Sequence, residues 1–132
     1  MKKLFTLILA ITLSGAAFAQ TEVIKRAADA VSRIHDRMND PDSFVLVKVF
    51  TTKPDKHGDV SVCYAFRARN AMGGYGSGGR AVLRANNSLE IFDHAGESGE
   101  YIGWDAGWVH PCGTKQRADD ITAEVKAEIS AK

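Results

Sequence analysis

The sequence predicts an α+β fold, in which an N-terminal helix packs on a four- to five-stranded antiparallel sheet that is followed by a short C-terminal helix. Three observations lead to this prediction. Apolar residues recur at helical spacing near both ends of the chain, and short runs between them alternate apolar and polar residues, as strands do. The chain also contains only two cysteines, which we expect to form one disulfide.

The first nineteen residues have the three regions of a secretory signal peptide. Lys2 and Lys3 form the positive start, residues 4–13 form an apolar run, and Ala17-Phe18-Ala19 matches the A-x-A cleavage pattern. The apolar run is shorter than the stretch of about 20 residues that spans a bilayer. We therefore expect cleavage after Ala19, a periplasmic or secreted location, no membrane insertion after signal removal, and a single exported α+β domain formed by residues 20–132.

The processed chain is expected to be small and nearly neutral. Removing residues 1–19 from the 132 leaves 113 residues, which is enough for one domain of ordinary size. Since the signal peptide carries two of the 17 basic residues and none of the 16 acidic ones, the processed chain has a formal charge of −1. Such a chain has no overall attraction to nucleic acid or to an anionic membrane, so we expect no nucleic-acid partner. Any binding must come from a local patch.

The segment from Thr21 to Asn39 is predicted to be an amphipathic helix that packs on the sheet. Its apolar residues recur every three or four positions: Ile24, Ala27, Val31, Ile34 and Met38. Pro41 disfavours helical backbone at the residue before it, so the helix is expected to stop there. The D-P-D-S sequence of residues 40–43 is then expected to form a turn.

Two strands are predicted to follow this turn. Residues 44–52 are rich in β-branched and aromatic residues, with Val45, Val47 and Val49 on one face and Lys48 on the other. The K-P-D-K-H-G sequence of residues 53–58 reads as a hairpin loop. Residues 60–70 then alternate clearly and place Cys63 on the same face as two arginines, Arg67 and Arg69.

Residues 80–85 and 88–93 are predicted to form a second hairpin around Asn86-Asn87, because asparagine tolerates left-handed backbone. With a two-residue turn, Arg80 would face Asp93 and form an ion pair across the strands. Residues 101–109 are a candidate edge strand, and residues 119–131 have the apolar spacing of a C-terminal helix.

Cys63 and Cys112 are expected to form the disulfide, because an oxidising exported setting permits disulfides to form and persist. A bridge that closes about 50 residues stabilises a fold by about 4 kcal/mol in the chain-entropy model. A redox or metal-binding pair is the alternative, but the sequence has neither a C-x-x-C spacing nor a histidine cluster.

Three short motifs together resemble a group of small, uncharacterised exported bacterial proteins: D-P-D-S-F at residues 40–44, the cysteine at position 63, and R-N-A-M-G-G-Y at residues 69–75. Members of this group show a D-P-x-S turn after a helix, a strand, and then a strand cysteine followed by an N-x-x-G-G-Y segment. The resemblance covers residues 38–79 and implies an exported α+β domain but no reaction. Members often have a glycine directly after the cysteine, where this chain has Tyr64, so the backbone packing beside the disulfide need not be the same.

No catalytic constellation stands out, so we expect a protein that is not an enzyme and has no metal or other cofactor. The four histidines lack the H-E-x-x-H spacing of metal ligands: His35, His57, His94 and His110. Ser77 has a glycine on each side, as in a nucleophile elbow, but the elbow requires a strand before it and a helix after it in a large α/β sheet. The glycine-rich segment, residues 73–79, also lacks a phosphate-binding motif, so its glycines are expected to supply positive φ angles or to lie close against a neighbouring element.

Candidate binding residues flank this glycine-rich segment. They are four arginines on the adjoining strands, with an asparagine and a tyrosine beside them: Arg67, Arg69, Asn70, Tyr75, Arg80 and Arg84. If the arginines share a face, they form a local basic patch. The alternative is that they are ordinary solvated charges on exposed strand faces.

A second candidate surface lies between residues 94 and 110. Tyr101, Trp104 and Trp108 could stack on a sugar, and three carboxylates are near them in sequence: Glu97, Glu100 and Asp105. The alternative is that the tryptophans pack in the core.

We therefore expect an exported, non-enzymatic binding or interaction module whose ligand is an unidentified envelope protein or glycan. The alternative is a small envelope-glycan hydrolase that uses the carboxylates of residues 97–105. A purely mechanical role in the envelope is a third possibility.

Overall fold

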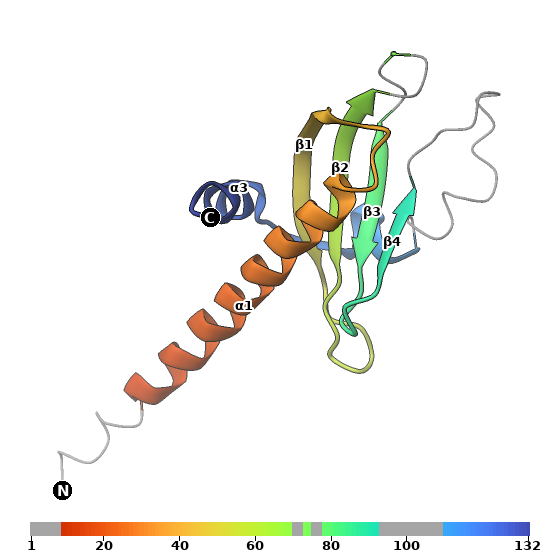
Figure 1. Cartoon of the computed structure of the whole chain (residues 1–132). Coiled ribbons are helices and arrows are strands. Elements are labelled where there is room, and N and C mark those ends of the chain that lie inside the picture. The colour runs from red at the N-terminus through yellow and green to blue at the C-terminus, as the bar shows by residue number, and fades with distance from the viewer. Residues whose placement is uncertain (1–8, 70–72, 75–77, 93–109) are drawn as a thin grey trace, which may run out of the picture.

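The computed structural model describes residues 9–69, 73–74, 78–92 and 110–132. It confirms the α+β class, with an N-terminal helix, a five-stranded antiparallel sheet, a short C-terminal helix and one disulfide (Figure 1). The elements are α1 (Leu9–His35), β1 (Asp40–Thr52), β2 (Val62–Arg69), β3 (Gly79–Leu83), β4 (Leu89–Phe92), η1 (Thr114–Gln116), β5 (Arg117–Asp120) and α3 (Thr122–Ser130). The strand order in the sheet is β4-β3-β2-β1-β5.

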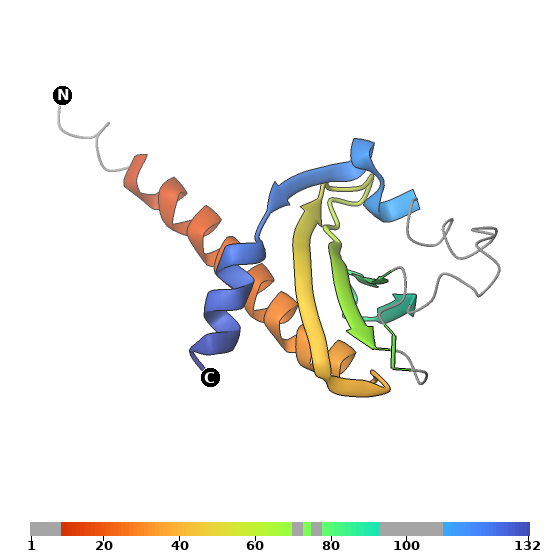
Figure 2. The same ribbon diagram turned by 90° about the horizontal axis from the view of Figure 1, so that it is seen from above.

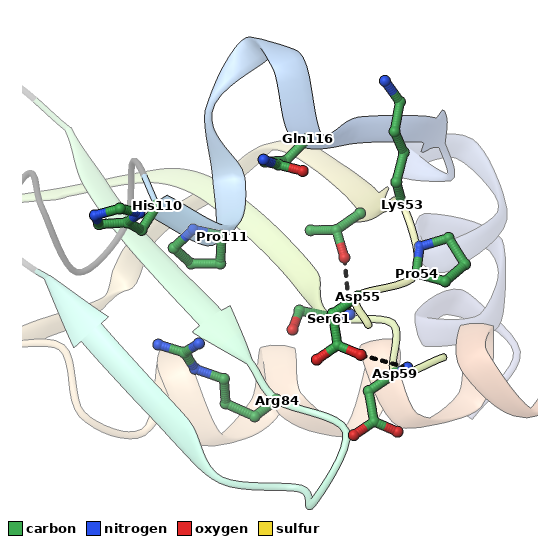
Figure 3. Close-up of a pocket in the computed structure, with 10 residues that line it drawn as sticks. Lys53, Pro54, Asp55, Asp59, Ser61, Arg84, His110, Pro111 and Gln116 are labelled. Carbon is green, nitrogen blue, oxygen red and sulfur yellow. Dashed lines mark hydrogen bonds between the residues drawn. The ribbon is translucent and has the colours of Figure 1, made fainter. Parts of the chain in front are cut away.

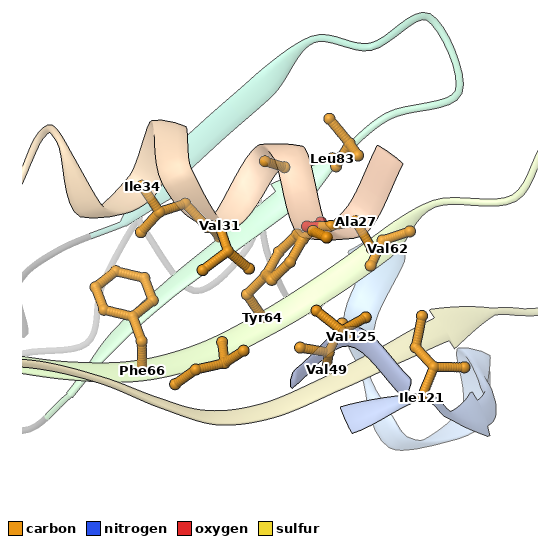
Figure 4. Packing of buried hydrophobic residues seen from close by; sticks show 14 of the residues in the cluster. Ala27, Val31, Ile34, Val49, Val62, Tyr64, Phe66, Leu83, Ile121 and Val125 are labelled. Carbon is orange, nitrogen blue, oxygen red and sulfur yellow. The ribbon is translucent and has the colours of Figure 1, made fainter. Parts of the chain in front are cut away.

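The helices α1 and α3 lie on one face of the sheet, which we call the helix face (Figure 2). The predicted apolar stripe of α1 is confirmed, because it packs on alternate residues of the central strands, among them Tyr64 and Phe66. Val125 of α3 joins the same core (Figure 4). The buried Tyr64 hydroxyl donates a hydrogen bond to the backbone carbonyl of Ala27 at 3.2 Å, which ties the sheet to α1 inside this core.

The start of α1 projects away from the rest of the domain (Figure 1). Residues 15–22 are exposed, Val23 and Ile24 are the first that pack against the core, and Ala27 is the first fully buried residue. The core therefore draws nothing from residues 15–19 of the predicted signal peptide. No described helix has the length and apolarity that crossing a membrane requires.

The junction between α1 and β1 differs from its prediction at both ends. The helix ends at His35, and residues 36–39 make a turn that is tightened by hydrogen bonds from Arg37 N to Ile34 O and from Met38 N to His35 O. The strand β1 already begins at Asp40, so the predicted D-P-D-S turn is the start of a strand. The helix therefore ends before the position that Pro41 was expected to set, and the chain reverses ahead of the proline.

The hairpin of β3 and β4 has a register one residue away from the predicted one. Arg84 N donates to Ser88 O and Asn87 N donates to Arg84 O, so the loop holds three residues, with Asn87 in the left-handed region at φ 67°. Arg80 therefore lies opposite Phe92, so the predicted register is wrong, while the expected ion pair with Asp93 lies outside the described residues. The longer loop places Leu89 and Ile91 on the helix face, where they pack against the core.

The fifth strand is one that the sequence did not reveal. Residues Arg117–Asp120 pair with the end of β1, and all four are exposed. Because these residues belong to β5, the C-terminal helix starts at Thr122 and not at the predicted residue 119. Ile121 is the N-cap residue of this helix, and Asp120 before it satisfies the first helical residue, since its Oδ1 accepts hydrogen bonds from Thr122 N at 3.0 Å and Thr122 Oγ1 at 2.6 Å. The edge strand predicted at residues 101–109 lies outside the described residues.

A second, smaller core lies on the other face of the sheet, which we call the open face. Cys63 and Cys112 form the predicted disulfide there, and both are fully buried together with Phe50 and Val82. The bridge holds residues 110–116 against this face. A buried disulfide of this kind is compatible with an extracellular location.

Candidate binding surfaces

The open face carries a group of basic side chains beyond the disulfide. Ala65 of β2 pairs with Lys48 of β1 on one side and with Arg80 of β3 on the other. Arg67 and Arg69 follow Ala65 on the same face of β2, since successive side chains of a strand alternate between faces. We call the surface formed by Lys48, Arg67, Arg69 and Arg80 the basic face. Arg67 and Arg69 are exposed and Arg80 is half-buried.

Lys48 is part of this face because of a β-bulge that the sequence did not reveal. The register of β1 shifts between Leu46 and Lys48, so that Val47 is an extra residue opposite β2. The predicted alternation of residues 44–52 is therefore wrong beyond this point: Leu46 and Val49 both face the helices. Lys48 Nζ lies 3.4 Å from Asp120 Oδ2, and Val45, opposite Arg67, is 51% exposed.

Arg84 does not belong with the other three arginines. It follows β3 at the opposite end from Arg80 and pairs through Nη2 with Glu90 Oε2 at 3.4 Å. Asn70 and Tyr75, the two other candidate binding residues, lie outside the described residues. The structure thus places Arg67, Arg69 and Arg80 on one face together with Lys48. Arg84 lies elsewhere, in a concavity between the β1–β2 loop and residues 110–116.

That concavity, which we call the hairpin pocket, has a volume of about 710 Å³. Three segments line it: the β1–β2 loop, the end of β3, and residues 110–116 (Figure 3). Arg84 and His110 lie on one side, and the carboxylates of Asp55 and Asp59 lie on the other (Figure 3). No pattern in the sequence indicates this pocket, because its walls are far apart in the chain.

Asp55 holds the β1–β2 loop in shape. Its Oδ1 accepts hydrogen bonds from the backbone N–H groups of His57 at 2.7 Å and Asp59 at 3.0 Å. These bonds, the one from Asp59 first, hold the pKa of Asp55 below its usual range, so the side chain is a carboxylate at neutral pH. Gly58 completes the loop in the left-handed region at φ 82°.

The glycine-rich segment has the structural role that the sequence predicts, as far as it is described. Gly73 and Gly78 have φ angles of 81° and 93°. Gly79 lies under the ring of Phe66, where an added Cβ would come within 2.1 Å of the ring carbon Cε2. Gly73 and Gly78 therefore allow a left-handed backbone conformation, and Gly79 allows the backbone to lie close to the Phe66 ring.

The described histidines take part in no catalytic grouping. His35 Nδ1 lies 3.2 Å from Asp36 Oδ1 and its ring meets Phe44 edge-on, while His57 is exposed in a loop. No three His, Cys, Asp or Glu side chains come together as a metal site within residues 9–69, 73–74, 78–92 and 110–132. The aromatic and acidic candidates of the second surface, and His94, lie outside these ranges.

Comparison of the chain with protein-family models, curated proteins and solved structures found no match. The resemblance to small exported bacterial proteins therefore stays a prediction.

Proposed function

We propose that the protein is an exported, non-enzymatic binding module that recognises an acidic protein partner through its basic face. The observation that carries this proposal is the row in which Ala65 lies between Lys48 and Arg80, with Arg67 and Arg69 continuing the same face. Lys48, which pairs with Asp120, and Arg80 flank Ala65, and Arg67 and Arg69 extend the same face with exposed side chains. Together they make a locally positive surface on a chain whose overall charge is close to zero. Such a surface attracts acidic partners and orients them.

An apolar residue next to the arginines favours a protein over a polyanionic glycan. Val45 lies opposite Arg67 on β1 and leaves half of its surface in water. Arginine beside exposed apolar surface is typical of protein interfaces, where arginine is enriched among the residues that dominate binding. The carboxylates of the alternative glycan hydrolase, Glu97, Glu100 and Asp105, are not among the described residues, so no observation favours that function.

Export is supported by two independent features. The first nineteen residues have the pattern of a signal peptide, and residues 15–19 add nothing to the core. The buried Cys63–Cys112 disulfide is typical of proteins in oxidising compartments, where such bonds form and persist. Fractionation of cells that produce the full chain, with sequencing of the purified N-terminus, tests this part: Gln20 as the first residue supports it, and a cytoplasmic protein that begins at Met1 contradicts it.

Affinity capture from envelope extract tests the binding surface. We expect the wild-type protein to recover a partner that protease treatment of the extract removes and that high salt releases, because the attraction between exposed charges is screened. The Arg67→Ala/Arg69→Ala variant should lose it at least tenfold. The matched control is Lys25→Ala/Arg37→Ala, which removes two exposed cations elsewhere.

Two results would contradict the proposal. One is equal recovery by the wild type and by the Arg67→Ala/Arg69→Ala variant. The other is a captured partner that survives protease but is lost after glycan digestion, which would assign the basic face to a glycan.

A further inference from the structure

The hairpin pocket is a site separate from the basic face. Its volume of about 710 Å³ falls in the range of small-molecule sites, about 300–1,000 Å³. Its walls come from three segments that the fold fixes independently. Each wall must be held in place for the pocket to act as a preformed site.

The wall that carries Arg84 is tied to α1. Arg26 donates from Nη2 to the backbone carbonyls of Arg84 at 3.0 Å and Ala85 at 3.2 Å. Arg33 donates from Nη1 to the carbonyl of Asn87 at 3.3 Å. Two helix arginines thus fix the β3–β4 turn, and the ion pair with Glu90 orients the Arg84 guanidinium.

The two other walls are fixed as well. The acidic wall is the β1–β2 loop, closed by the hydrogen bonds that Asp55 accepts and by Thr52 Oγ1, which accepts from Ser61 N at 3.0 Å. The third wall, residues 110–116, is anchored by the disulfide at Cys112. Lys53 also binds it, since its backbone N–H donates to Gln116 O at 2.7 Å and its Nζ donates to Lys115 O at 2.9 Å.

Two lysine or arginine side chains among the described residues line the pocket. Arg84 lies on one side, and the carboxylates of Asp55 and Asp59 lie on the other (Figure 3). Lys53 lies on the side of the carboxylates, but its Nζ donates to Lys115 O, and Arg84 is the cation of the opposite side (Figure 3). A guanidinium is suited to bind a carboxylate through parallel hydrogen bonds, and a carboxylate is suited to bind an ammonium group. A ligand with two negative ends or two positive ends would place one end against a like charge, which is unfavourable.

We propose that the hairpin pocket binds a small zwitterion, an amino acid or a short peptide, with its carboxylate on Arg84 and its ammonium group on Asp55 and Asp59. Pro54 and Pro111 provide apolar surface between the two ends. The site does not depend on the proposed function, because no residue of the basic face lines it.

A series of ω-amino acids from glycine to 6-aminohexanoate, together with the dipeptide alanyl-alanine, tests this proposal and measures the spacing of the charges. Binding is followed by calorimetry or by NMR titration of the full processed protein. We expect saturable binding of at least one zwitterion, and at least tenfold weaker binding of glutarate and of cadaverine, which have two like charges. Arg84→Gln and Asp59→Asn should each weaken binding of the zwitterion at least tenfold, the loss typical of a hydrogen bond between charged groups.

Arg37→Gln is the control, since it removes an exposed arginine far from the pocket lining, and it should leave the affinity unchanged. Thermal unfolding of each variant shows that the fold is intact, and Asp59→Asn keeps the test valid if Arg84→Gln does not fold. Glutarate bound as tightly as the zwitterions, with no effect of Asp59→Asn, would overturn the proposal in favour of a simple anion site. Absence of saturable binding by any probe up to about 50 mM would overturn it as well.

Discussion

At the scale of single residues, Tyr64 makes the stability of the fold depend on pH. Its phenol is fully buried, and burial raises its pKa well above the usual value, against a smaller lowering by Arg26 and Arg33. The folded state therefore prefers the neutral phenol. Its stabilising effect is complete below the unfolded-state pKa of about 10 and is lost as the pH rises above that value, because only the unfolded chain then releases the proton.

We expect Tyr64→Phe to lower the free energy of unfolding by about 1 kcal/mol at pH 7, since the hydrogen bond to Ala27 O is lost. Between pH 9 and 11 the wild type should lose stability more steeply than the variant. Urea unfolding at a series of pH values measures both effects. Parallel pH profiles of the two proteins would show that Tyr64 titrates normally.

Gly79 is the residue that allows β3 to pass under Phe66. An added methyl group would collide with the ring, which is itself buried, so Gly79→Ala should destabilise the fold by about 1–3 kcal/mol. Combining it with Phe66→Leu should give less than the sum of the two single effects, because the smaller side chain leaves room. A Gly79→Ala protein within about 0.5 kcal/mol of the wild type would mean that the ring moves aside freely.

At the scale of elements, Thr122 joins β1 to α3. Its Oγ1 accepts a hydrogen bond from Val49 N at 2.9 Å and lies 3.2 Å from Val49 O and 2.6 Å from Asp120 Oδ1. Ile121 N donates to the same Val49 carbonyl at 3.0 Å. One hydroxyl thus serves both the edge of the sheet and the start of the helix.

Replacing Thr122 by valine keeps the shape of the side chain but leaves Val49 N without its acceptor. We expect Thr122→Val to lower the free energy of unfolding by about 1–3 kcal/mol, and Thr122→Ser to lose less than 1 kcal/mol. Chemical denaturation compares the two. Equal stability of both variants would mean that the hydroxyl contributes nothing to the junction.

The elements that the sequence predicts well are those with a strong apolar pattern. The stripe of α1 and the alternation of β2 both mark real buried faces, because burial imposes helical or two-residue spacing on apolar residues. β5 could not be predicted, since an exposed edge strand with the sequence R-A-D-D has no buried face to impose a pattern. The β3–β4 register was wrong because Asn86-Asn87 is compatible with a two-residue or a three-residue loop.

The residues of the two candidate surfaces also differ in whether a sequence pattern predicts them. Arg67 and Arg69 follow from the alternation of β2, whereas Lys48 joins them only through the bulge at Val47, for which the sequence has no signal. The hairpin pocket depends on long-range contacts: Arg84, Asp55 and His110 meet through the sheet and the disulfide.

At the scale of the whole molecule, the disulfide holds residues 110–116 against the sheet. It joins β2 to the segment before β5 over a separation of 49 residues. A Cys63→Ala/Cys112→Ala variant should lose about 2–5 kcal/mol of unfolding free energy, as small secreted domains do. Denaturation in the absence of reductant measures this loss. A variant as stable as the wild type would show that packing alone holds residues 110–116.

Photo-crosslinking in intact cells tests the binding face most directly. A photoreactive amino acid at Val45, beside Arg67, reports on the basic face, and one at Ala123, an exposed residue of α3, reports on a different surface. We predict a discrete protein adduct from position 45 that disappears when Arg67→Ala/Arg69→Ala is added, and no such adduct from position 123. The same adducts from both positions, or an adduct at position 45 that the arginine variant retains, would contradict recognition through the basic face.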